Sequence, residues 1–249
     1  MIRKLSIIGL LSISTLASAI SITEQENQEK ENIKILSNLG LPIPGTGIVV
    51  APRASFDSSE KFLKASANAD RERKTLGYVN IDTEQPSELM NIEKTVEQYK
   101  KQLQIINSDK STSMRDKLSD LKLAFTFKPV PKTLYIKYIG ATPTGAFNND
   151  GWTGAAEFFT VKNIGTCSYA LISIPVSKMS MTIAEEAVSY DINNKISLIE
   201  TSGNKKSGFI YNIQWYDDEY FHELECANMN FSRKIIQSGI ELAKNIDNA

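Results

Sequence analysis

Residues 209–226 alternate between apolar and polar side chains on both sides of Asp217-Asp218, and this pattern constrains the fold more than any other in the chain. Side chains two residues apart lie on one face of a β-strand, so the pattern predicts two strands. One face collects the apolar residues together with the histidine: Phe209, Tyr211, Ile213, Trp215, Tyr220, His222, Leu224 and Cys226. Because only that face can be buried, we predict a hairpin that pairs Tyr216 with Glu219 and points Cys226 into the core.

The rest of the second half shows further strand-like segments and ends with a helix-like segment. Further strands are expected over 133–139, 156–162, 167–174 and 196–201, whereas 181–192 fits either a helix or a strand. An apolar stripe then predicts a helix over 230–247: Phe231, Ile235, Ile236, Ile240, Ala243 and Ile246. Residues 128–249 are therefore expected to form an antiparallel sheet that is covered by a C-terminal helix.

Helical spacing dominates the first half instead. One stripe has apolar residues three and four apart, which predicts a helix over 87–107: Leu89, Ile92, Val96, Tyr99, Leu103 and Ile106. Further helices are expected over 23–38 and 113–121. The helical spacing of apolar residues ends at the two prolines of 128–132. The predicted fold class is α+β: a mainly helical region over 20–127, the antiparallel domain over 128–249, and one disulfide.

The first nineteen residues have the pattern of a cleavable secretory signal. Arg3 and Lys4 precede a mostly apolar run over 5–16, and Ala17-Ser18-Ala19 supplies the small residues of a cleavage site. That run is too short to cross a membrane, so we expect cleavage after Ala19 and a secreted or periplasmic protein without stable membrane insertion. With 28 basic and 29 acidic residues, the chain lacks the basic surplus that nucleic-acid binding requires.

The chain has two cysteines, Cys167 and Cys226. An oxidising compartment favours a disulfide between them, and the alternatives are two buried thiols or a redox pair. Redox pairs usually have C-x-x-C spacing, which is absent here, so we predict a structural disulfide.

His222 is the single histidine, which excludes two-histidine metal sites and the H-E-x-x-H motif. In the predicted hairpin it faces inward, whereas the nearby Glu219, Glu223 and Glu225 face outward, so no metal site is expected. Ser58 and Lys61 have the S-x-x-K spacing of a serine nucleophile beside a lysine base, but its partner motifs S-D-N and K-T-G are missing. We therefore assign no catalytic residue and no cofactor.

Aromatic residues at strand spacing ordinarily fill a core, and the alternative is a ligand face formed by Trp215, Tyr220 and His222. The sequence favours an exported protein that acts by binding a protein or small-molecule partner, with no evident catalytic activity. A monomer is favoured, although the oligomeric state stays open. The alternatives are an unrecognised secreted hydrolase and an envelope assembly component.

Overall fold

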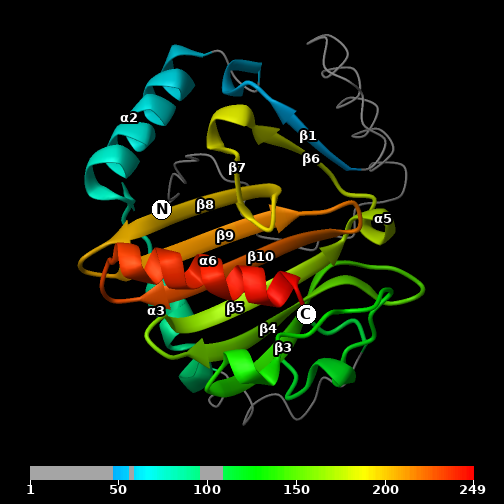
Figure 1. The fold of residues 1–249 in the computed structure, drawn as a ribbon. Coiled ribbons are helices and arrows are strands. Elements are labelled where there is room, and N and C mark those ends of the chain that lie inside the picture. Colours follow the sequence, from blue (N-terminus) through cyan, green and yellow to red (C-terminus); the bar gives the residue numbers. More distant parts are fainter. Residues whose placement is uncertain (1–46, 56–58, 96–108) are drawn as a thin grey trace, which may run out of the picture.

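The computed structural model describes residues 47–55, 59–95 and 109–249, and a mixed eight-stranded sheet forms its centre (Figure 1). Across the sheet the strands run in the order β2 (Val79–Asn80), β8 (Lys195–Asn204), β9 (Gly208–Tyr216), β10 (Tyr220–Asn228), β5 (Gly165–Ser173), β4 (Trp152–Val161) and β3 (Lys137–Phe147). The short strand β7 (Ser189–Ile192) also pairs with β8. All these pairs are antiparallel except β2 with β8, which is parallel.

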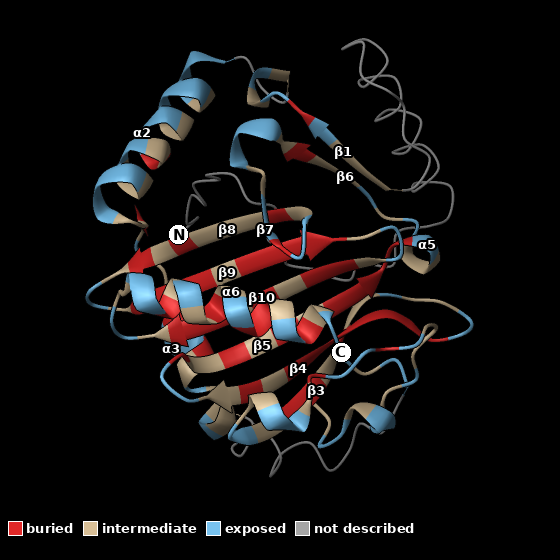
Figure 2. Ribbon diagram, viewed as in Figure 1, coloured by how far each residue is buried: buried red, intermediate tan, exposed pale blue. Residues whose placement is uncertain are grey.

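The C-terminal helix α6 (Arg233–Asp247) covers one face of this sheet. It begins at Ser232, whose side chain accepts a hydrogen bond from the backbone N–H of Lys234 and so caps the helix. Its sheet-facing side is buried and its outer side is exposed (Figure 2): Ile235, Gly239, Leu242, Ala243 and Ile246 are the buried residues. The main core lies between this helix and the inner residues of β5, β9 and β10.

Two smaller apolar clusters lie at the ends of the opposite face. One gathers the short helix α3 (Gln85–Met90), Ile210 and Ala227. The other includes Tyr216, Phe221 and Ile183 of β6 (Ser180–Ala184), which pairs in parallel with β1 (Gly47–Ala51). The short helix α5 (Ile174–Ser177) lies between β5 and β6.

Helix α2 (Glu60–Leu76) lies beyond the β8 side of the sheet and is mostly exposed (Figure 2). It ends at Gly77, which adopts a left-handed conformation with a φ of 86°. An ion pair between Arg73 and Glu200 ties it to β8. Short 3-10 helices complete the described residues: η1 (Arg53–Ser55), η2 (Leu118–Asp120), η3 (Lys132–Leu134) and η4 (Glu185–Ala187).

The predicted α+β fold with a helical N-terminal half is wrong, because strands dominate the described residues and the sheet is mixed. The expected helix over 113–121 contains only the 3-10 turn Leu118–Asp120, and Arg115 forms a β-bridge with Ala141. Leu118 and Leu121 pack against the main core from this irregular chain, so their apolar character reflects burial without a helix.

Other predictions for the first half are tested in part or not at all. The stripe over 87–107 overlaps α3 and further helical residues up to 95, and its remainder lies outside the described residues. The expected signal over 1–19 and helix over 23–38 also lie outside them. The sheet includes β2, which precedes the expected boundary at residue 128, and that boundary stays a prediction.

The strands and the closing helix of the second half are confirmed in type, although β3 begins later and extends further than expected. Residues 181–192 contain most of β6 and all of β7, separated by η4. The predicted disulfide between Cys167 and Cys226 is confirmed, and it joins the neighbouring strands β5 and β10.

The predicted hairpin register is wrong by two residues, since Trp215 pairs with His222 and Tyr216 with Phe221. A longer turn replaces the two-residue turn because the Asp217 carboxylate accepts hydrogen bonds from the backbone N–H groups of Glu219 and Tyr220. A shift of two leaves every side chain on its predicted face. His222 and Cys226 are therefore buried, as expected.

Candidate functional site

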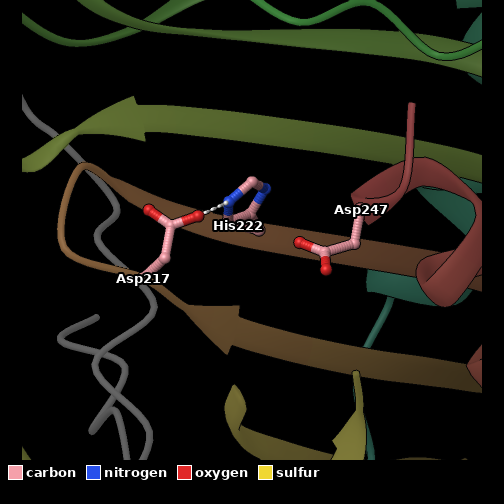
Figure 3. Close-up of side chains that lie close together, drawn as sticks. All are labelled: Asp217, His222 and Asp247. Carbon is pink, nitrogen blue, oxygen red and sulfur yellow. Dashed lines mark hydrogen bonds and ion pairs between the residues drawn. The ribbon is translucent and has the colours of Figure 1, made fainter. Parts of the chain in front are cut away.

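Four charged or titratable side chains from separate elements meet at one edge of the main core. Lys195 begins β8, Asp217 lies in the β9–β10 turn, His222 lies on β10, and Asp247 ends α6. We call these four residues the ionic cluster. Figure 3 shows Asp217, His222 and Asp247 directed toward one another, and one ligand atom from each lies within 4.8 Å of the others.

His222 is held at both ring nitrogens. Its Nε2 lies 3.3 Å from Oδ2 of Asp217, and its Nδ1 lies 2.9 Å from the hydroxyl of Tyr169. Burial raises the pKa of Asp217, but hydrogen bonds from His222 and from backbone N–H groups bring it well below its usual value. Burial lowers the pKa of His222, and the partly opposing effect of Asp217 does not reverse this.

The lowered pKa values of Asp217 and His222 determine which ring nitrogen of His222 carries the proton. An ionised carboxylate can only accept, so the neutral His222 ring donates from Nε2 to Asp217. Its Nδ1 then has a lone pair, which accepts the hydroxyl proton of Tyr169. The ring is therefore neutral and oriented from two sides.

Lys195 joins the two aspartates. Its Nζ lies 3.1 Å from Oδ2 of Asp217 and 2.6 Å from Oδ1 of Asp247. Burial lowers the pKa of Lys195, but the hydrogen bonds to both carboxylates outweigh this and raise it above its ordinary value. The ammonium group therefore places a positive charge between the two carboxylates.

Asp247 has two further donors. The indole N–H of Trp215 donates to Oδ1 over 2.9 Å, and the amide of Asn193 donates to Oδ2 over 2.8 Å. Burial raises the pKa of Asp247, whereas the hydrogen bonds from Lys195, Asn193 and Trp215 lower it further than burial raises it. The Asp247 side chain is 5% exposed, so the last turn of α6 is anchored through a buried carboxylate.

The residues of the predicted ligand face do lie together. The rings of Trp215 and His222 stack with centroids 4.8 Å apart, and Tyr220 meets His222 edge-on at 6.0 Å. Trp215 and His222 are 0% and 2% exposed, however, so they line the interior, and Tyr220 is half-buried. A ligand-binding role for these three residues stays a prediction.

The opposite face of the hairpin has a different character, which we call the polar face: Asn212, Gln214, Glu223 and Glu225. The amide of Asn212 donates to Oε1 of Glu223 over 3.0 Å and to Oε1 of Glu225 over 3.2 Å. Gln214 donates to the same oxygen of Glu223 over 2.6 Å. Gln85 at the start of α3 donates to Oε1 of Glu225 over 3.0 Å.

The two carboxyl groups of the polar face are close enough to share one amide donor. Burial, followed by the negative charge of Glu223, raises the pKa of Glu225 to about 7. Near neutral pH Glu225 is therefore protonated for part of the time.

The sequence-based analysis identified His222 but missed Lys195, Tyr169 and Asp247 as its neighbours. Asp247 lies four residues after Ala243 and one after Ile246, at the border of the apolar stripe of α6. The carboxylate at that position could have indicated a buried ionic contact. When a helix covers a sheet, residues at the edge of its apolar stripe are partly buried. Of the S-x-x-K pair, Lys61 is exposed on α2, and Ser58 lies outside the described residues.

Among the residues that the structure describes, no helix is both long enough and apolar enough to cross a membrane. No protein-family model matches this chain, and no curated protein or solved structure is detectably similar to it.

Proposed function

We propose that this protein is exported to the periplasm or medium and acts there by binding a partner through the polar face. The signal-like pattern of residues 1–19 supports export. The disulfide between Cys167 and Cys226 is compatible with an oxidising compartment.

The observation that carries the proposal is the composition of the sheet between the two small apolar clusters. There β9 and β10 present the half-buried Asn212, Glu223 and Glu225, with the buried Gln214 beneath them, in place of the apolar residues that cover their other face. On the adjacent β5, Ser168 and Ala170 are half-buried, so small side chains continue this surface. A polar area in the middle of a large sheet suits a partner that offers hydrogen bonds and charge.

The charges on this face indicate the chemistry of the partner. Glu200 already has Arg73 as its ion-pair partner, whereas Glu223 and Glu225 form no ion pair with another described residue. The raised pKa of Glu225 reflects burial beside a second carboxylate, and among the described residues no cation forms an ion pair with either group. A lysine or arginine side chain of a partner would supply that charge.

The arrangement of His222 favours binding over hydrolysis. A general base must reach the substrate, but this imidazole is 2% exposed and bonded at both nitrogens within the protein. The ionic cluster therefore supports the position of α6, and we place the interaction surface elsewhere.

Capture from the host's own periplasm and medium tests the proposal. The immobilised wild-type protein, a Glu223→Gln/Glu225→Gln variant and a Glu241→Gln control would be compared, the control because Glu241 lies on the outer side of α6. We expect one partner that the wild type and the control retain and the double variant loses. Equal retention by all three would contradict the role of the polar face, and turnover of ester, peptide or glycoside substrates that disappears on changing Ser58 or His222 would contradict a binding function.

A further inference from the structure

We propose that Asp217, His222 and Asp247 form a site for a divalent transition-metal ion, and that the ammonium group of Lys195 occupies the cation position when no metal is bound. This site is separate from the polar face and does not depend on the proposed partner. The inference rests on the ligand set, on the groups that orient the ligands, and on the cation position between the two aspartates.

The ligand set offers two carboxylate oxygens and one imidazole nitrogen within 4.8 Å of one another. Zinc binds such ligands at about 2.0–2.2 Å, so the three atoms must approach one another by about 1 Å to surround one ion. Rotation of the Asp217 and Asp247 carboxylates supplies a movement of that size. The outward-facing Glu219, Glu223 and Glu225 take no part, and Asp247 of α6 completes the set in their place.

Each of the three ligands is oriented by an outer partner, as in natural metal sites. When Nε2 of His222 binds the ion, the ring proton moves from Nε2 to Nδ1, which then donates to the hydroxyl oxygen of Tyr169, 2.9 Å away. Asp217 accepts two backbone N–H groups through Oδ1, which leaves Oδ2 facing the centre. Asn193 holds Oδ2 of Asp247 in the same way and leaves Oδ1 facing the centre.

The centre of the cluster already binds a cation. Lys195 Nζ contacts the two oxygen atoms that would bind a metal, Oδ2 of Asp217 and Oδ1 of Asp247. Its side chain is 30% exposed, so the flexible stem can carry the ammonium group out into water. Metal entry exchanges one cation for another and leaves neither carboxylate without a positive neighbour.

The mixed oxygen and nitrogen set selects the class of metal. Magnesium and calcium prefer oxygen ligands alone, whereas imidazole suits zinc, copper, iron and nickel. Zinc and cobalt(II) are therefore the informative probes, since zinc gives a clear binding heat and cobalt(II) reports its ligands by visible absorption.

Calorimetric titration of the full chain with Zn²⁺ tests the inference, with Mg²⁺ as the comparison. We expect weak Zn²⁺ binding by the wild type and at least about tenfold tighter binding by Lys195→Met, which lacks the competing charge. Lys234→Met removes an exposed lysine near the start of α6 and should bind as the wild type does. Adding Asp247→Asn to Lys195→Met should abolish both the binding heat and the cobalt absorption.

Two results would overturn the inference. One is a folded Lys195→Met protein with an intact disulfide that binds no Zn²⁺. The other is binding whose affinity is the same in all variants, including Asp247→Asn, because the ion then lies elsewhere. If Lys195→Met does not fold in the presence or absence of Zn²⁺, Lys195→Gln keeps two N–H donors without the charge, and the same criteria apply to it.

Discussion

Cys167 and Cys226 are direct cross-strand partners between β5 and β10, so the disulfide closes a contact that the sheet itself makes. Both residues lie in the main core, and they are 59 positions apart in the sequence. The bond therefore lowers the conformational entropy of the unfolded chain by closing a long loop. In the folded state it joins two residues that the pairing of β5 with β10 already holds side by side.

Reduction of this disulfide should destabilise the protein. In the chain-entropy model, breaking a cross-link that closes a loop of this length lowers the free energy of unfolding by about 4 kcal/mol. Urea unfolding with and without a reductant measures the difference. A Cys167→Ala/Cys226→Ala variant is the control, and its unfolding free energy should not respond to the reductant. A wild-type midpoint that is equally insensitive would show that the bond contributes no stability.

Glu225→Gln should stabilise the protein above neutral pH. The pKa of Glu225 rises from 4.5 to about 7 in the folded state, so the fold favours the protonated form and loses stability as pH rises from 4.5 to about 7. The amide stays neutral, and we expect a gain of about 1–3 kcal/mol at pH 8 that is much smaller at pH 4. Unfolding across pH measures it, with the exposed Glu219→Gln as the control. An equal effect at both pH values would contradict the assignment.

Tyr169→Phe should cost about 1–3 kcal/mol, because it leaves Nδ1 of the buried His222 without a donor while the ring is retained. Tyr220→Phe removes a hydroxyl whose recorded contact is a long one, 3.5 Å to the carbonyl oxygen of Thr126, and should change stability by less than about 0.5 kcal/mol. Thermal or urea unfolding of both variants gives the comparison. If the two substitutions cost the same, the Tyr169–His222 hydrogen bond contributes nothing measurable.

Gly165→Ala should be far more destabilising than Gly47→Ala. The two glycines have nearly the same φ, 131° and 133°, so each alanine carries a similar backbone strain. At Gly165 the added Cβ would also lie 2.1 Å from the carbonyl oxygen of Ala227, whereas at Gly47 it meets no atom of the described residues within 4 Å. We expect an additional loss of more than about 2 kcal/mol at Gly165, measured by urea unfolding. Equal losses would contradict this prediction, because they would mean that the backbone of β10 moves away from the added Cβ without a loss of stability.

The hairpin shows which structural features a local sequence pattern can predict and which it cannot. The alternation over 209–226 placed each side chain on the right face, because burial of one face is a local property of each strand. It missed the register, since the length of the turn depends on hydrogen bonds from the Asp217 carboxylate, which alternation does not encode. The disulfide followed from the cysteine count and from the predicted inward direction of Cys226.

The ionic cluster was beyond such patterns because its members are distant in sequence. Lys195, Asp217 and Asp247 meet only after α6 has packed on the sheet. The helical expectation for 113–121 failed for a related reason: the apolar residues there reach the core from an irregular chain that contains a single 3-10 turn. Periodicity reports burial, and over a short stretch it does not identify the backbone conformation that achieves it.

The two parallel strand pairs among the described residues bear on the order in which the molecule folds. Gly47 pairs with Ser180, and Val79 pairs with Ser202, so β1 and β2 find their partners far along the chain. Parallel pairs with such separations must close long loops before they gain contacts, which slows their formation. A ribosome releases the N-terminal segment first. We therefore expect the strands that are made first to be among the last to pair, on a sheet that the hairpins of the second half have already formed.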